Sequence, residues 1–175
     1  MPTQQLTLTT TNMRNLVIAN KSDVIYYEIV TPRWEKDVTR ISRKDPNTRA
    51  FNVVGELRNE FERPVAVRMY GGEFRPVEDF LGRPSGEDAF LKGKFQGKDG
   101  RSYIWRVKGR HLELVQEDNS GNTPVAVFHP HKRYLFVLRM SRHPYLEIDA
   151  SMLDALDSVI ISFILIQHRR RDGCK

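Results

Sequence analysis

An apolar run of eight residues, broken only by Ser162, extends from Val159 to Ile166 near the C-terminus of this chain. If the run is helical, it is apolar on every side, so every side must be covered by other groups. A helix over about residues 152–167 would measure roughly 24 Å, whereas a bilayer core requires about 20 consecutive apolar residues. The run therefore predicts a buried core helix, and we expect no transmembrane segment.

The residues that flank the run support a helix. Ser151 is the expected N-cap, and Asp154 and Asp157 fall in the first turns, where the helix dipole favours negative charge. The arginines of residues 169–171 fall at the opposite end, where the dipole favours positive charge. Because β-branched residues in the run lower its helix propensity, a thirteenth strand is the structural alternative.

The chain before this helix reads as short strands separated by turn residues, which is typical of an all-β sandwich or barrel. The Asp99-Gly100 pair is a strong hairpin signal. We therefore predict a mainly β fold, an antiparallel β-barrel of about twelve strands enclosing the C-terminal helix, as a single domain over residues 1–170 with a short tail at 171–175. The expected strands are 5–9, 16–18, 24–30, 38–43, 50–57, 65–70, 74–80, 90–96, 102–108, 111–116, 125–129, 134–139 and 145–148.

The net charge and the cysteine content indicate what kind of partner and which compartment to expect. The formal net charge of +6 favours anionic partners in general, such as acidic lipid headgroups, nucleic acid or acidic proteins. Cys174 is the only cysteine, and the N-terminus does not carry the pattern of a secretory signal. We expect an intracellular, cytoplasmic protein.

The order of several motifs resembles a family of fungal tubby-like proteins. These motifs are Ile25–Thr31, the segment from Phe95 to Trp105, Pro124–Phe128 and the closing helix over 153–166. The resemblance implies the tubby C-terminal-like fold, shared by tubby, phospholipid scramblase and LURP-one-related proteins, and a basidiomycete source. It implies no established activity, and neither the phosphoinositide site of tubby nor the scramblase calcium segment can be matched to residues here.

The hairpin around Asp99-Gly100 is the predicted binding site. A two-residue loop, in either of two registers, places Lys92, Lys94, Tyr103 and Trp105 on one face, and Leu91, Phe95 and Ile104 on the core face. A surface of lysines and aromatic rings can contact phosphate and lie at a lipid interface. The alternative is an ordinary barrel exterior in which lysine stems cover the rings. The ligand-binding residues that we predict are Lys92, Lys94, Tyr103, Trp105, Arg106 and Lys108.

Other chemistries have little support. His129 and His131 would share a strand face, but Pro130 and the lack of cysteines or clustered carboxylates disfavour a metal site. Neither a nucleophile elbow nor a P-loop is found, so we predict no catalytic residues, no cofactor and no enzyme activity. The arginines of residues 169–171 either contact acidic lipid or nucleic acid, or simply cap the helix and lead into a solvated tail.

The sequence therefore predicts a non-enzymatic binding or scaffolding module that contacts anionic phospholipid, such as phosphoinositide, at an intracellular membrane surface. The first alternative is a module that binds a protein partner or regulates it without lipid. Nucleic-acid binding is the third and weakest reading.

Overall fold

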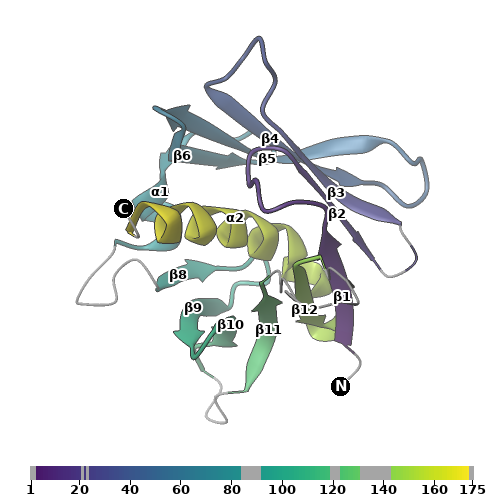
Figure 1. The fold of residues 1–175 in the computed structure, drawn as a ribbon, viewed down its shortest axis with the longest axis vertical. Helices are drawn as coiled ribbons and strands as arrows, with labels where there is room; N and C mark the ends of the chain where they lie inside the picture. The colour runs from purple at the N-terminus through teal and green to yellow at the C-terminus, as the bar shows by residue number, and fades with distance from the viewer. Residues whose placement is uncertain are drawn as a thin grey trace, which may run out of the picture.

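The computed structural model describes residues 3–20, 22, 24–83, 92–118, 123–130 and 143–173, and within these it contains twelve strands and three helical segments (Figure 1). The strands are β1 (Thr3–Leu8), β2 (Leu16–Asn20), β3 (Ile25–Val30), β4 (Val38–Lys44), β5 (Phe51–Glu60), β6 (Arg63–Met69), β7 (Arg75–Pro76), β8 (Gly93–Gln96), β9 (Ser102–Lys108), β10 (His111–Gln116), β11 (Pro124–His129) and β12 (Tyr145–Asp149). The helical segments are α1 (Val77–Leu81), the 3-10 helix η2 (Ala150–Ala155) and α2 (Leu156–Gly173).

The strands form one antiparallel sheet in the order β7-β6-β5-β4-β3-β2-β1-β12-β11-β10-β9-β8. Strands that follow one another along the chain pair, except β7 and β8, and the pairing of β1 with β12 joins the two halves of the sheet. Over the described residues the edge strands β7 and β8 do not pair, so the sheet curls around the core without closing. The prediction of a mainly β, twelve-stranded antiparallel fold around a C-terminal helix is thus confirmed.

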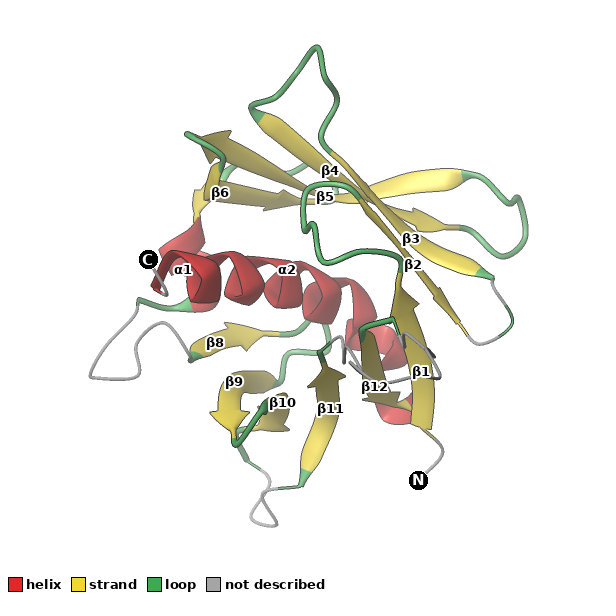
Figure 2. Cartoon of the chain, viewed as in Figure 1, coloured by secondary structure: helices red, strands yellow, loops and turns green. Residues whose placement is uncertain are grey.

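Helix α2 lies between the two halves of the sheet, with β2–β6 on one side and β8–β11 on the other (Figure 2). Every residue from Leu156 to Gln167 is buried. Gly55 lets β5 approach the helix, since a Cβ there would lie 2.5 Å from the Cδ1 atom of Ile161. The segment Ala150–Arg171 is long and apolar enough to cross a membrane, but 78% of its most apolar 18-residue window is buried inside the fold, as in the core helix of a soluble protein.

The helix begins differently from the prediction. Asp149, not Ser151, is the capping residue, and its carboxylate accepts a hydrogen bond from the Ser151 backbone N–H at 2.9 Å. This cap starts η2, and α2 follows only at Leu156. The alternative of a thirteenth strand over 159–166 is wrong, because a strand would leave its backbone groups unpaired at the centre of the fold.

A short helix fills the seam between the edge strands. The expected strand 74–80 is correct only for the two residues of β7, since Pro76, with φ near −50°, leads directly into α1. Leu81 of α1 is fully buried against Gly93 of β8, where a Cβ would come within 2.8 Å of the leucine side chain. Helix α1 therefore bridges the two edges. The expected strand 134–139 and the first two residues of the expected strand 90–96 lie outside the described residues.

Candidate binding surfaces

The predicted hairpin forms, but with a three-residue loop. Gln96 pairs with Ser102 and Gly93 with Trp105, which leaves Lys98-Asp99-Gly100 as the loop. Gly100, with φ near +79°, occupies the left-handed position that closes such a loop. A shift of one residue in the register turns every side chain of one strand to the other face of the sheet.

The aromatic side chains of β9 consequently point inward, which corrects the predicted site. Tyr103 and Trp105 are both completely buried, and the Trp105 indole Nε1 donates a hydrogen bond to the Ser162 hydroxyl at 2.9 Å. Phe95 is in the core as expected, but Ile104 is half-buried on the outer face, and Leu91 lies outside the described residues. The rings and the lysines do not share a face.

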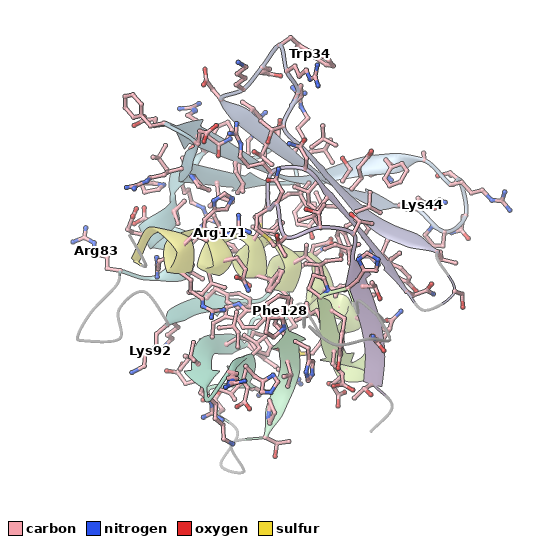
Figure 3. The ribbon with its side chains drawn as sticks, viewed as in Figure 1. Trp34, Lys44, Arg83, Lys92, Phe128 and Arg171 are labelled. Atoms are coloured by element: carbon pink, nitrogen blue, oxygen red, sulfur yellow. The ribbon has the colours of Figure 1, made fainter. Side chains whose placement is uncertain are left out.

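The cations of the predicted site remain on the outside and are partly engaged. Lys94 forms an ion pair with Glu117 at 2.7 Å, and Arg106 forms one with Glu113 at 3.2 Å. Lys92 and Lys108 are exposed, and Lys92 projects away from the fold in Figure 3. Without aromatic neighbours from β9 on their face, these cations do not form the predicted lysine–aromatic surface.

A different surface gathers exposed aromatic side chains. The loop between β3 and β4 carries Trp34, which is 87% exposed, and the turn between β5 and β6 carries Phe61, which is 99% exposed. Trp34 lies at the outermost point of its loop (Figure 3). Since β4 pairs with β5 through Val38 and Arg58, the two loops leave the same end of the sheet. We call the two loops, residues 31–37 and 61–62, the aromatic end.

Hydrogen bonds hold the loops of the aromatic end in place. The backbone N–H of Asn59 donates to the Asp37 carbonyl at 2.7 Å. Arg14, from the loop between β1 and β2, forms an ion pair with Glu62 at 2.7 Å and donates to the Lys36 carbonyl at 3.1 Å. These contacts fix the backbone of the two loops that carry Trp34 and Phe61.

The charges beside Trp34 favour an anionic partner. Arg33 and Lys36 are exposed, and neither side chain forms an ion pair with a described residue. The carboxylate of Glu35 is turned away to an ion pair with Arg40. The tip therefore presents an indole between two cations that form no ion pair with a described residue, and the exposed Asp37 follows them in the same loop.

A buried polar cluster surrounds Asp157 at the start of α2. Its carboxylate accepts hydrogen bonds from the hydroxyls of Tyr27 and Tyr70, at 2.5 and 2.7 Å, and lies 3.4 Å from the Arg43 guanidinium. Burial, and then the charge of Asp157, raise the pKa of the Tyr27 hydroxyl well above its usual range. Burial and the hydrogen bond to Asp157 raise the pKa of Tyr70 in the same direction. The cluster anchors the helix to β3 and to the end of β6.

Among the histidines and C-terminal arginines that the sequence suggested as binding residues, those that the structure describes have structural roles or neighbours in the fold. His129 stacks on Tyr145 and lies 3.3 Å from Glu147, while His131 is outside the described residues. Over the described ranges, no group of three histidine, cysteine or acidic side chains could hold a metal ion. Arg169 donates to the Gly82 and Lys92 carbonyls, and Arg171 donates to the Thr11 carbonyl. These two arginines therefore tie the end of α2 to neighbouring loops.

Comparison with known proteins identifies a family. A family model described as a family of unknown function, DUF6593, matches residues 11–172. The chain belongs to this family. The DUF6593 match includes the aromatic end and all of the sheet except β1. A solved X-ray structure of a protein from Arabidopsis thaliana is similar, with 13% identity, a TM-score of 0.49, and coverage of 99% of this chain and 92% of that one. No curated protein matches.

Sequence reasoning missed the aromatic end because it looked for aromatic residues on strands. The available signal was an aromatic residue inside a turn-forming segment: Trp34 follows Pro32-Arg33, and Phe61 stands between two glutamates. An aromatic side chain in a polar turn has no core face to occupy, whereas Tyr103 and Trp105 alternate with polar positions on a strand.

Proposed function

We propose that this protein is a non-enzymatic binding module that docks on anionic membrane surfaces through the aromatic end. The observation that carries the proposal is the near-complete exposure of Trp34 and Phe61 on neighbouring loops. Exposed large apolar side chains at loop tips lose contact with water when they enter the lipid interface, where indole rings are favoured. The lipid contact inferred from sequence is retained, and its site is moved from the β8–β9 hairpin.

The charges of the aromatic end support an anionic surface over a neutral one. Each lysine or arginine near an anionic bilayer contributes about 1 kcal/mol, and Arg33 and Lys36 are available for this. Stable membrane association generally requires an apolar and an electrostatic contribution together. Both are present within four residues of one loop.

Two finer statements belong to the proposal. The first is membership of the tubby C-terminal-like superfamily, supported by the twelve-stranded antiparallel sheet that curls around a buried C-terminal helix. The second is a basidiomycete source, supported by the order of the sequence motifs. A location in the cytoplasm is likewise proposed, in keeping with the burial of the one strongly apolar helix.

Vesicle sedimentation tests the proposal. The full chain is mixed with phosphatidylcholine vesicles with and without phosphatidylserine or phosphoinositide. Trp34→Ala and Phe61→Ala should each weaken binding by more than about tenfold, since burial of such a side chain is worth about 1.5–3 kcal/mol. The matched control is Phe51→Ala, a partly exposed phenylalanine at the opposite end of β5.

Charge reversal separates the two possible lipid surfaces. Arg33→Glu with Lys36→Glu should reduce binding to anionic vesicles, and more strongly at low salt. Lys92→Glu with Lys94→Glu reports on the hairpin instead and should have little effect. If the wild-type chain does not bind anionic vesicles at low salt, the membrane proposal is wrong, and Trp34 and Phe61 are better explained as anchors for a protein partner.

A further inference from the structure

A small cavity opens at the seam of the sheet, at the end of β6 opposite Phe61. It has a volume of about 270 Å³, just below the range of about 300–1,000 Å³ typical of small-molecule sites. Its walls come from both edges of the sheet, from α1 and from α2. The lining residues are Met69, Tyr70, Arg75, Asp79, Phe80, Gln96, Gly97, Lys98 and Ser158.

Two cations face each other across this seam cavity. Arg75 belongs to β7 on one edge, and Lys98 belongs to the β8–β9 loop on the other. Neither forms an ion pair with a described residue; the Lys98 ammonium lies 4.7 Å from the centre of the Tyr70 ring. An anion that enters the cavity would be attracted by both charges.

The nearby carboxylates do not neutralise both cations. Asp157 is committed to Tyr27, Tyr70 and Arg43. Asp99 accepts hydrogen bonds from the Tyr103 hydroxyl, at 2.6 Å, and from a backbone N–H. Of the lining residues only Asp79 is acidic, so the cavity holds two cations and one carboxylate.

Ser158 adds a hydrogen-bond donor to the wall of the cavity. Its side chain is 2% exposed and lines the cavity, yet its hydroxyl makes no hydrogen bond with any described residue. By contrast, the hydroxyl of Ser162, one turn later on α2, has two hydrogen-bond partners. It donates to the Val159 carbonyl and accepts from the Trp105 indole N–H. The Oγ atom of Ser158 is not one of the buried side-chain atoms that lack a partner, so the hydroxyl opens onto the cavity, where its donor is available to solvent and to a bound molecule.

The remaining lining includes apolar side chains, Gln96 and a glycine. Phe80, Met69 and the Tyr70 ring supply apolar surface. Gly97 keeps the loop close to η2, because a Cβ there would lie 2.9 Å from the Tyr103 ring and 3.3 Å from Ala155. The cavity therefore combines three separate donors, Arg75, Lys98 and Ser158, with an apolar wall.

We propose that the seam cavity binds a small organic phosphate monoester, with the phosphate between Arg75 and Lys98 and the organic part against Phe80. Three donors on three walls match the three terminal oxygens of a phosphate monoester better than the two oxygens of a carboxylate. The inference is independent of membrane docking, because the cavity and the aromatic end lie at opposite ends of β6. The phosphate group could belong to a soluble metabolite or to a lipid headgroup.

Titration with phenyl phosphate, followed by NMR at the amides of Gly97 and Ser158, tests this site. Saturable shifts are expected, with weaker binding of inorganic phosphate, which lacks the ring. Arg75→Gln and Lys98→Gln should each reduce affinity about tenfold or more, the ratio for one lost charge-assisted hydrogen bond. Ser158→Ala should weaken binding, and Lys108→Gln, an exposed cation at the end of β9, should not.

Absence of saturable shifts, or equal affinity of the wild-type chain and Arg75→Gln, would overturn the site. Inorganic phosphate binding as tightly as phenyl phosphate would overturn the role of the apolar wall. The source of the phosphate is read from vesicle sedimentation of Arg75→Gln: reduced binding to phosphoinositide vesicles indicates a headgroup, and unchanged binding indicates a soluble ligand. Because Trp34→Ala leaves the seam cavity intact, loss of membrane docking and loss of the phosphate site are distinguishable.

Discussion

The indole of Trp105 donates a hydrogen bond to the hydroxyl of Ser162 at 2.9 Å, deep between the sheet and the core helix. Both side chains are fully buried, and the Trp105 ring also packs against Phe163. This contact joins β9 to α2 across the centre of the fold. It also explains why Trp105 is not available to a ligand on the surface.

Ser162→Ala should destabilise the protein by about 1–3 kcal/mol, because the indole N–H would remain buried without an acceptor. The free energy of unfolding is measured by urea denaturation. Ser151→Ala is the control, since Ser151 is exposed on η2. An unchanged unfolding free energy for Ser162→Ala would mean that the indole finds another acceptor.

Ile164→Asp should prevent folding, because Ile164 is completely buried and an ionised carboxylate there would have no partner. Leu153→Asp, at a side chain that is 44% exposed on η2, should fold normally. Circular dichroism and gel filtration distinguish the two outcomes. Soluble, folded Ile164→Asp protein would contradict the placement of α2 at the core.

Stability should fall as the pH rises above about 10, with Tyr27 as one cause. The pKa of Tyr27 is raised in the folded state by burial and by Asp157, whereas tyrosine in the unfolded chain titrates near 10. Below that pH both states hold the proton; above it only the unfolded state loses it, which favours unfolding by about 1 kcal/mol per pH unit.

Urea denaturation between pH 8 and 11 measures this effect. Tyr27→Phe should be less stable than the wild-type chain at pH 8, because it loses the hydrogen bond to Asp157. Its stability should then decline less steeply above pH 10. Equal slopes for the two proteins would remove Tyr27 as the source of the pH dependence.

The two tryptophans should report separately on membrane contact. Trp34 is 87% exposed and Trp105 is fully buried, so Trp34→Phe leaves only a buried fluorophore. Anionic vesicles should shift the emission of the wild-type chain to shorter wavelength, since the Trp34 indole leaves water. The emission of Trp34→Phe should not change. A vesicle-induced shift that persists in Trp34→Phe would place the contact elsewhere.

Local sequence signals were sufficient to predict most of the described strands and the buried helix. The period-2 strands, the turn residues between them and the apolar run at 159–166 predicted nearly all of the described strands and the buried helix. The short strand 75–76 and α1 were missed as such, because a helix of five residues, three of them buried and apolar, is too short to show a helical period. Apolar patterns of five or six residues fit both structures.

Local sequence signals could not predict which face of the β8–β9 hairpin points into the core. Alternation along β9 places Tyr103 and Trp105 together, but which side they occupy depends on the length of a loop. The predicted two-residue loop would have placed the lysines and the aromatic rings on one surface. The loop has three residues, and Tyr103 and Trp105 are therefore buried in the core. The inward face was available because Ser162 and Phe163 of α2 provide an acceptor and a packing partner.

The sequence by itself determined that the chain is mainly β, that strands follow one another in antiparallel order and that one helix, apolar on all sides, must be enclosed. These properties follow from hydrophobic periodicity and turn chemistry, which act over a few residues. Only the tertiary structure decided which side chains are exposed together. Trp34 and Phe61 lie on loops at the same end of the sheet, and Arg75, Lys98 and Ser158 line one cavity at its seam, because strand pairing and the helix bring together segments that are far apart in the chain.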